Sequence, residues 1–378
     1  MLVYLDHAAT TPVSPEGAQA ALEVMTEGFG NPSSRYKLGT QAAARLREDR
    51  QSVAQALGCE SGELFFTSCG TEGDSWAVRG AADYNRRRGR HIVTTSIEHS
   101  AVLEPVKELE AQGYEVTRLR PDRSGHIDPG ELEAALRPDT VLVSVMLVNN
   151  EMGTIQPVRE AAQAIRRTGC PALLHSDAVQ GFLKLPFTPS ELGVDLLTIS
   201  GHKVRAPKGI GGLYIRKELV GKWKPMLPGG GQEGGLRSGT EPTAQIAALA
   251  AVCRSWDREA NRRHMEALKT YALASLQAKV EGLQVVSAGD APHICVVTLP
   301  GYSSEMLVRD LGDRGICVSS GSACHKGKPS HVFAALGLRK QELMGMLRIS
   351  FGPTNSRQDI DALVSALVEI KQQRIAVR

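Results

Sequence analysis

The sequence predicts an α/β fold in which a large domain holds a doubly wound, mainly parallel β-sheet and a smaller α+β domain follows it. Two observations predict this fold. Short apolar runs rich in β-branched residues alternate with helical stretches through most of the 378 residues. After Pro242 the alternation gives way to a long helical run, from Thr243 to about Lys279. A hydrophobic content of 42% at this length is enough for two cores.

The expected strands are short and apolar, as in a sheet that is covered on both faces. Between two of them, residues 158–168 show apolar positions at helical spacing, and a final helix begins near Gln358. In chain order the expected strands are residues 1–6, 64–67, 92–95, 141–148, 172–175, 194–199, 213–215, 294–299 and 347–351.

Composition excludes some broad classes of function. A net charge of +3 gives no general attraction to nucleic acid or to a membrane, and no run approaches the ~20 apolar residues of a membrane span. The first residues lack the charged and apolar segments of a secretory signal, and seven cysteines, an odd number, indicate free thiols in a reducing compartment. We therefore expect a cytoplasmic protein. The arginine cluster at 86–90 could serve tRNA or an acidic partner but is more typical of a solvated helix end, so we expect no direct nucleic acid binding.

The segment Ser200-Gly201-His202-Lys203 follows an apolar strand and precedes a glycine-rich turn. An amine in a desolvated cleft has a lowered pKa and can hold an aldehyde cofactor as a Schiff base, although a lone lysine is usually a surface residue. Upstream, Asp177 ends another strand. A carboxylate there can keep the ring nitrogen of a pyridine cofactor protonated, whereas an isolated Asp at a strand end is more often a helix cap. The pair of residues favours the cofactor interpretation.

Three further segments carry chemistry. Residues 67–73 combine hydroxyls with the expected start of a helix, which suits a phosphate group, and Thr71 is the best candidate there; a capping turn without a ligand is the alternative. Cys324 lies in a loop of small residues and is followed by His325 and Lys326, whose positive charge would raise its thiolate fraction. Arg348 lies within an apolar strand, where it could bind a carboxylate or form a structural ion pair.

These segments resemble, in order and separation, the pyridoxal-phosphate-dependent cysteine desulfurases of the class V aminotransferase family, the NifS/IscS-like group. The resemblance covers nearly the whole chain. It implies a fold-type-I transferase with a large cofactor domain at residues 16–257, a small domain made of residues 1–15 and 258–378, and a homodimer. The segments are YLDHAATTP at 4–12, HSDAVQ at 175–180, ISGHK at 199–203, LRSGTEP at 236–242 and SSGSAC at 319–324.

The resemblance also implies roles for further residues. His99 would stack on the cofactor ring and move protons, Asn150 and Gln180 would donate to its phenolic oxygen, and Asn149 is a competing candidate for the role of Asn150. Thr240, in a glycine-rich loop, would reach the cofactor phosphate of the neighbouring subunit. The remaining cofactor contacts implied are Gly70, Ser200 and His202, with no metal.

We therefore expect a cysteine desulfurase. Arg348 and Asn150 would bind L-cysteine, Lys203 or His99 would take its α-proton, and the Cys324 thiolate would take its sulfur, which leaves L-alanine and an enzyme persulfide. The persulfide would pass to an acceptor protein, either an iron-sulfur scaffold or a tRNA-thiolating enzyme. A selenocysteine lyase or another enzyme of the same class V fold is the alternative within the family, and a non-catalytic phosphate-binding protein is the alternative outside it.

Overall fold

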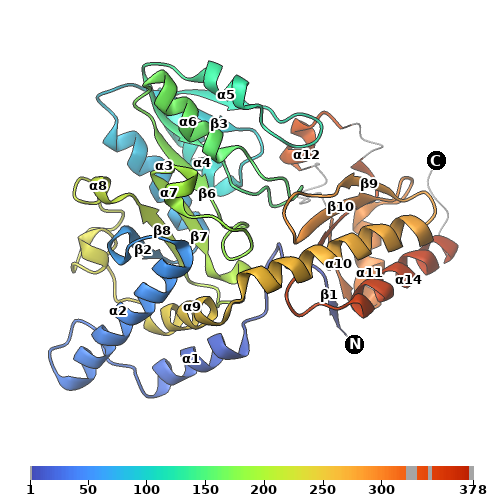
Figure 1. The fold of residues 1–378 in the computed structure, drawn as a ribbon, viewed down its shortest axis with the longest axis horizontal. Helices are drawn as coiled ribbons and strands as arrows, with labels where there is room; N and C mark the ends of the chain where they lie inside the picture. The colour runs from blue at the N-terminus through green and yellow to red at the C-terminus, as the bar shows by residue number, and fades with distance from the viewer. Residues whose placement is uncertain (1, 321–329, 339–342, 374–378) are drawn as a thin grey trace.

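The computed structural model describes residues 2–320, 330–338 and 343–373. Its larger sheet has seven strands in the order β2-β8-β7-β6-β5-β3-β4 (Figure 1). Neighbouring strands are parallel except that β8 runs antiparallel to both β2 and β7, so the sheet is mainly parallel, as predicted. The strands are β2 (Leu64–Thr67), β3 (His91–Thr95), β4 (Glu115–Leu119), β5 (Thr140–Ser144), β6 (Leu173–Asp177), β7 (Leu196–Ser200) and β8 (Gly211–Ile215).

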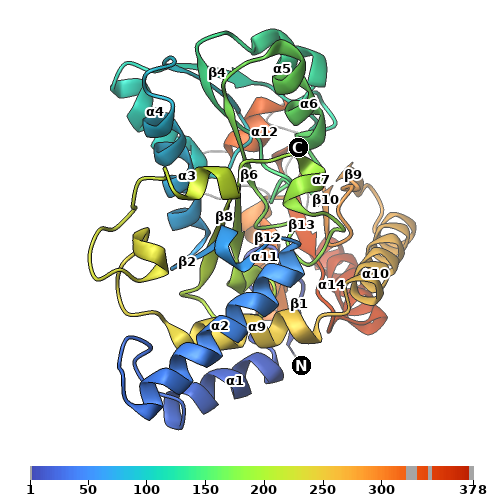
Figure 2. The same ribbon diagram turned by 60° about the vertical axis from the view of Figure 1, so that its left-hand side comes forward.

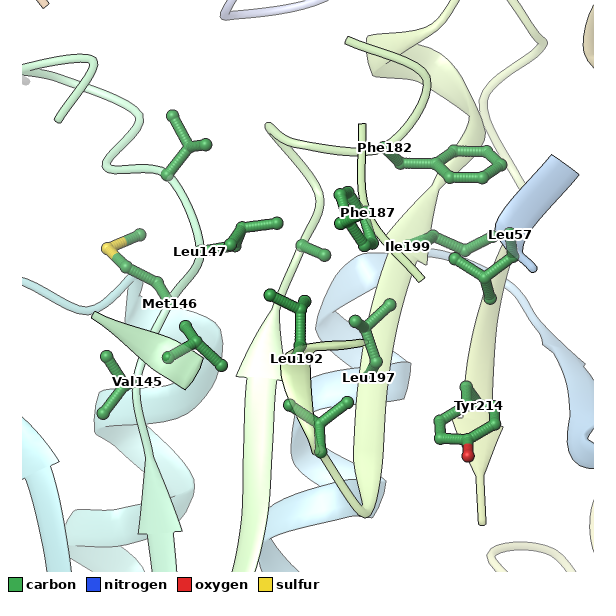
Figure 3. Packing of buried hydrophobic residues seen from close by; sticks show 14 of the residues in the cluster. Leu57, Val145, Met146, Leu147, Phe182, Phe187, Leu192, Leu197, Ile199 and Tyr214 are labelled. Atoms are coloured by element: carbon green, nitrogen blue, oxygen red, sulfur yellow. The ribbon is translucent and has the colours of Figure 1, made fainter. Parts of the chain in front are cut away.

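Both faces of this sheet are buried, because neighbouring residues along each strand pack into different cores. Leu196 of β7 packs in the core beneath α3 (Gly70–Tyr84) and α4 (Ser100–Ala111), whereas Leu197 packs in the core on the other face. That second core also includes residues of α2 (Lys37–Leu57), α6 (Val158–Thr168), α7 (Pro189–Leu192) and α9 (Thr243–Ser255). Figure 3 shows part of it, including Leu192 and Leu197.

A second, antiparallel sheet lies toward the C-terminal part of the chain and has the order β12-β13-β10-β9. It has its own hydrophobic core, which includes residues of α10 (Arg258–Lys279), α11 (Ser304–Asp313) and α14 (Arg357–Gln373). Figure 2 shows these helices beside the antiparallel strands. The strands are β9 (Gln284–Ser287), β10 (Ile294–Thr298), β12 (Ser319–Ser320) and β13 (Met346–Ser350).

The N-terminal residues join this second core. Strand β1 (Val3–Tyr4) pairs in parallel with β11 (Ile316–Cys317), and the buried side chains of Val3 and Leu5 pack with the C-terminal helices. The chain then crosses to α1 (Pro15–Thr26), which packs on α9 beside the large sheet. The remaining short helices are α5 (Pro129–Ala135), α8 (Lys217–Val220) and α12 (His331–Ala335).

Two predictions about the elements were wrong, and one strand of the large sheet was not predicted. The helical run after Pro242 is two helices, because Trp256 is extended and the Asp257 side chain caps the new helix by accepting from Ala260 N at 2.9 Å. The strand predicted at 141–148 ends at Ser144. Beyond it, Met146 N donates to a side chain, Glu98 Oε1, at 2.8 Å, in place of a neighbouring strand. Strand β4 was missed because its sequence is half polar and lies at the sheet edge. No helix in the described ranges is long and apolar enough to cross a membrane.

Candidate active site

A cavity of about 440 Å³ lies where β3, β6 and β7 end, at the carboxyl edge of the large sheet. The N-terminal turn and β13 of the second sheet complete its wall, so three regions far apart in the sequence meet there. Most of the predicted site residues line it. They are Gly70, Thr71, His99, Asn150, Asp177, Gln180, Ser200, His202, Lys203 and Arg348.

Lys203 closes a single 3₁₀ turn directly after β7, which points its side chain into the cavity wall. Its Nζ donates to the carbonyl oxygens of Ala8 and Ala9, at 2.7 and 2.6 Å. Burial, and secondarily the positive charge of Arg348, lowers the pKa of Lys203 to about 8. This amine is therefore neutral in a substantial fraction of molecules near neutral pH, as a nucleophile must be.

Asp177 ends β6 and is anchored by Val179 N, which donates to its Oδ1 at 2.9 Å. Burial, and secondarily the neighbouring carboxyl of Asp74, raises the pKa of Asp177 to about 7. Asp74 also lines the cavity and is 1% exposed, and its Oδ1 lies 3.5 Å from His175 Nε2. The sequence contained no signal for Asp74, because a single Asp in a helical segment is ordinarily a solvent-facing residue.

The other end of the cavity has the chemistry of an anion site. Helix α3 begins at Gly70, so the unpaired N–H groups of its first turn lie at this end together with the Thr71 side chain. Ser200 Oγ is buried and has no hydrogen-bond partner among the described residues. A Cβ on Gly70 would lie 2.9 Å from Val179 Cγ2 and 3.4 Å from the Ser200 Cβ, so a side chain there would crowd the cavity wall. These donors fit a phosphate group.

His99 caps α4: its Nδ1 accepts from Ala101 N at 3.1 Å. That nitrogen is therefore unprotonated, and Nε2 carries the ring hydrogen. Burial is the main cause that lowers the pKa of His99, and the charges of Lys203 and His331 act in the same direction while Asp177 opposes them. The ring is a neutral group that can donate a hydrogen bond from Nε2.

The two candidate asparagines occupy different environments. Asn149 is fully buried and its side chain is engaged within a turn, donating to Ile97 O at 3.0 Å and accepting from Glu151 N and Met152 N at 2.9 and 2.8 Å. Asn150, in contrast, lines the cavity. Only Asn150 of this pair has a side chain placed to meet a ligand.

Arg348 projects from β13, and two contacts fix its guanidinium. Nη1 donates to Asn150 O at 2.9 Å and Nη2 donates to Asp6 Oδ1 at 2.8 Å, while Nε is buried without a partner in the described part of the chain. Asp6 was not singled out from the sequence, although it belongs to the YLDHAATTP segment. A fixed, buried guanidinium beside the cavity suits the capture of a carboxylate.

Two predicted site residues are absent from this set of lining residues, for different reasons. Thr240 is exposed and does not line the cavity of its own chain. Its glycine-rich loop is nevertheless tied to the start of α3, because Arg237 Nε donates to Glu72 Oε1 at 2.9 Å. Cys324 lies outside the described residues. Before that stretch Ser319 and Ser320 line the cavity, and after it Ser330 Oγ donates to Glu151 Oε1 at 2.7 Å.

No group of three or more His, Cys, Asp or Glu side chains within residues 2–320, 330–338 and 343–373 is arranged to hold a metal ion.

Comparisons with known proteins agree over nearly the whole chain. The aminotransferase class-V family matches residues 3–363. Cysteine desulfurase IscS of Methanosarcina thermophila is 40% identical over 376 residues, which are 98% of this chain and 92% of that protein. A solved NifS-like protein is 35% identical, with a TM-score of 0.92 over 99% of this chain and 100% of that one. SspA in complex with cysteine is 33% identical, with a TM-score of 0.81 over 93% and 99% of the two chains.

Proposed function

The chain belongs to the class V aminotransferase family and is a pyridoxal-phosphate-dependent cysteine desulfurase, and from this premise we propose how its residues divide the reaction. One observation carries the proposal. The cavity holds an amine of lowered pKa, a buried carboxyl and a fixed guanidinium, supplied by Lys203, Asp177 and Arg348.

The cavity residues fit pyridoxal phosphate, as the unpartnered Ser200 hydroxyl and the free N–H groups of α3 indicate. Lys203 would bind its aldehyde and Asp177 its ring nitrogen, and His99 would stack on its ring. The phosphate would be held by Gly70, Thr71, Ser200 and His202 of the same chain, and the phenolic oxygen by Asn150 and Gln180. When bound, the cofactor supplies an electron sink that makes the Cα–H bond of an attached amino acid labile.

Arg348 would bind the carboxylate of L-cysteine. Nη1 donates to the Asn150 carbonyl and Nη2 donates to the Asp6 carboxylate. These two hydrogen bonds hold the guanidinium plane in place before the substrate arrives. A carboxylate would also meet the positive charge of a side chain that is only 7% exposed, so that solvent screens the attraction less than at the surface. Asn150 lines the same cavity and would give a second contact to the amino acid.

Lys203, not His99, would take the α-proton of cysteine. The Nδ1 atom of His99 already accepts from Ala101 N and its Nε2 carries a hydrogen, so the ring has no free lone pair to offer toward the cavity. A lysine amine of pKa about 8 is well matched to accept a proton at neutral pH and return it. His99 would serve as a hydrogen-bond donor from Nε2.

Sulfur removal would fall to Cys324. Its thiolate would attack the substrate sulfur, so that a new S–S bond forms as the C–S bond breaks and the electron pair remains on the carbon side. Protonation of that carbon gives L-alanine, and the enzyme retains the sulfur as a persulfide. The persulfide would then pass to an acceptor protein, an iron-sulfur scaffold or a tRNA-thiolating enzyme. The odd number of cysteines is the reason to expect a reducing compartment, the cytoplasm.

Two structural proposals accompany this mechanism. A hydrophobic core formed only by residues within 3–5 and 265–370 supports a division into a large domain at 16–257 and a small domain made of 1–15 and 258–378. Val296 and Met346 of the small domain join the core of the large sheet, where the two domains pack together. The exposure of Thr240 outside its own cavity supports a homodimer in which it reaches the phosphate of the neighbouring site. Exposed apolar side chains on α1 and the loop after it, Leu22, Met25, Phe29 and Tyr36, offer surface for a second copy to cover.

Replacing Cys324 tests the sulfur-transfer step. Cys324→Ala should keep the yellow colour of the bound cofactor, because Asp177, Lys203 and Arg348 are unchanged, but it should release neither alanine nor persulfide sulfur from L-cysteine. Mass spectrometry after one turnover of the unmodified enzyme should find the added sulfur on the peptide that contains Cys324. Cys317→Ala is the matched control and should retain both products. Wild-type release of alanine by Cys324→Ala, without added thiol, would remove Cys324 from the mechanism.

A further inference from the structure

A buried lysine that the proposed mechanism does not use lies behind the cavity. Lys184 is 2% exposed, and its Nζ donates to Gln180 Oε1 at 3.4 Å. Burial, and secondarily the charge of Lys203, lowers the pKa of Lys184 to about 7. A lysine head group with so few partners is costly to bury, so its placement next to a cavity residue calls for a function.

The backbone turn that places the Lys184 side chain in the interior is strained. Leu183, the residue before it, has φ of +60°, in the left-handed region that a bulky side chain rarely adopts. The turn is closed by hydrogen bonds from Lys184 N and Leu185 N to Gly181 O, both at 3.0 Å. A Cβ on Gly181 would lie 2.6 Å from Leu147 Cδ2, so this part of the chain is pressed against the core around Leu147 that Figure 3 shows. The turn therefore places Lys184 beside Gln180, four residues earlier.

A second donor reaches the same oxygen from the other sheet. His293, directly before β10, is fully buried, and its Nε2 lies 3.2 Å from Gln180 Oε1. Its Nδ1 is buried without a partner among the described residues, and burial holds the pKa of His293 well below its ordinary value. The ring is therefore neutral, with its hydrogen on Nε2, where it can donate to the Gln180 amide.

These two donors determine which way the Gln180 amide faces. Gln180 Nε2 donates to Ala8 O at 2.9 Å, and the same carbonyl accepts from Lys203 Nζ at 2.7 Å. Rotating the amide by 180° would set its NH₂ group against the donors of Lys184 and His293 and its oxygen against the Ala8 carbonyl. The observed orientation keeps the N–H side toward the N-terminal turn and the cavity.

We propose that Lys184 and His293 are positioning residues that lock the Gln180 amide with its N–H side toward the cavity, so that Gln180 can only donate to the phenolic oxygen of the cofactor. The inference rests on the proposed role of Gln180. Lysine retains N–H donors in both of its protonation states, so the lock survives across the pH range in which Lys184 titrates. Other basic groups near Lys184, namely His7, His202 and Lys203, accept nothing from it and take no part in the lock.

The test is the pH midpoint at which the absorption of the bound cofactor changes. The phenolic oxygen of the bound cofactor shares a proton with the lysine nitrogen to which the cofactor is attached. A hydrogen-bond donor to this oxygen stabilises its deprotonated form and lowers the pKa of the shared proton. Loss of the donor should therefore raise the pH midpoint. Gln180→Leu should raise it by roughly one pH unit, the effect of one charge-assisted hydrogen bond. The double variant Lys184→Met with His293→Leu should match that shift, and each single variant should give part of it. His293→Gln keeps a donor and should remain at the wild-type midpoint.

A double-mutant comparison separates positioning from a general effect of charge. In a Gln180→Leu background, Lys184→Met should cause no further shift. The inference would be overturned if Lys184→Met shifted the pH midpoint equally with and without Gln180. It would also be overturned if the double variant Lys184→Met with His293→Leu left the midpoint unchanged while Gln180→Leu shifted it. An unchanged midpoint in Gln180→Leu would instead refute the proposed role of Gln180. Should Lys184→Met fail to fold in thermal denaturation, the contrast of His293→Leu with His293→Gln decides the question.

Discussion

At the scale of single residues, the site holds more buried acid than one cofactor nitrogen requires. Asp74 and Asp177 both line the cavity, and burial raises the pKa of each to about 7. Two buried carboxyls within Coulomb range of each other cannot both ionise cheaply. Without the cofactor, at least one of them keeps its proton near neutral pH. A protonated ring nitrogen opposite Asp177 would supply the positive charge that lets Asp177 ionise.

This arrangement predicts how the stability of the apoprotein depends on pH. The pKa of Asp74 is about 7 in the fold against 3.8 ordinarily, so the folded chain keeps a proton that the unfolded chain has lost. The resulting stabilisation is fully present below pH 3.8 and is lost as the pH rises through 7. Between pH 5 and 8 the free energy of unfolding should fall by about 2 to 3 kcal/mol more in the wild type than in Asp74→Asn.

Urea denaturation of the apoprotein at the two pH values measures this difference. Asp313→Asn, which changes an exposed carboxylate, is the control and should follow the wild type. If Asp74→Asn and the wild type lost the same stability between pH 5 and 8, the Asp74 carboxyl would have to be ionised in the fold at both pH values. That result would contradict the argument that Asp74 and Asp177 do not both ionise in the apoprotein.

At the scale of elements, two ion pairs hold the glycine-rich loop of residues 228–240. Arg237 pairs with Glu72 at the start of α3, and Glu233 pairs with Arg50 of α2. Glu233 is 8% exposed, and its Oε2 accepts both from Arg50 Nη1 and from Phe66 N, each at 2.8 Å. The loop therefore has a rigid base on α2 and β2 while Thr240 remains exposed.

Replacing Arg50 tests how much the Arg50–Glu233 ion pair contributes to stability. Arg50→Ala leaves the Glu233 carboxylate buried without its charged partner and should lower the free energy of unfolding by about 3 kcal/mol. Arg47→Ala, on the exposed face of the same helix, is the matched control and should change stability by no more than about 0.5 kcal/mol. Thermal or urea unfolding distinguishes the two variants. Equal effects of both substitutions would mean that the buried pair contributes nothing to anchoring the loop.

The elements also explain which parts of the site could be predicted from the sequence. Lys203 and Asp177 follow strands, and parallel strands deliver their carboxyl ends to one edge, so local pattern alone brings them together. Asp74 and Lys184 lie in helical or turn segments where nothing in the sequence indicates burial, and their surroundings exist only after distant segments pack. Asp6 required knowledge that β1 pairs with β11 and that Asp6 itself bridges to Ser350 of β13. The break at Trp256 was missed because both flanking helices have good helical composition.

At the scale of the whole molecule, the proposed dimer has a direct test. Chains of Thr240→Ala and Lys203→Ala should each be inactive or nearly so, but a mixed dimer should recover activity. In one of its two sites the intact Lys203 and the intact Thr240 would come from different chains, so that site would be complete. Tagged heterodimers, purified and assayed for alanine release, should show up to about half of the wild-type rate per dimer. Confirmed heterodimers without any rescue would mean that Thr240 serves its own chain.

The N-terminal turn has a consequence for how the protein is made. Leu5 O accepts from Ser350 N at 2.8 Å, Asp6 accepts from Arg348, and Ala8 O accepts from Lys203. During synthesis Leu5 and Asp6 are translated some 340 residues before their partners in β13, whereas Lys203, the partner of Ala8, follows after 195 residues. A polypeptide that ends before β13 lacks the Arg348 guanidinium, which we propose as the contact of the substrate carboxylate. The cavity thus depends on a strand that is translated after every other strand in the described residues.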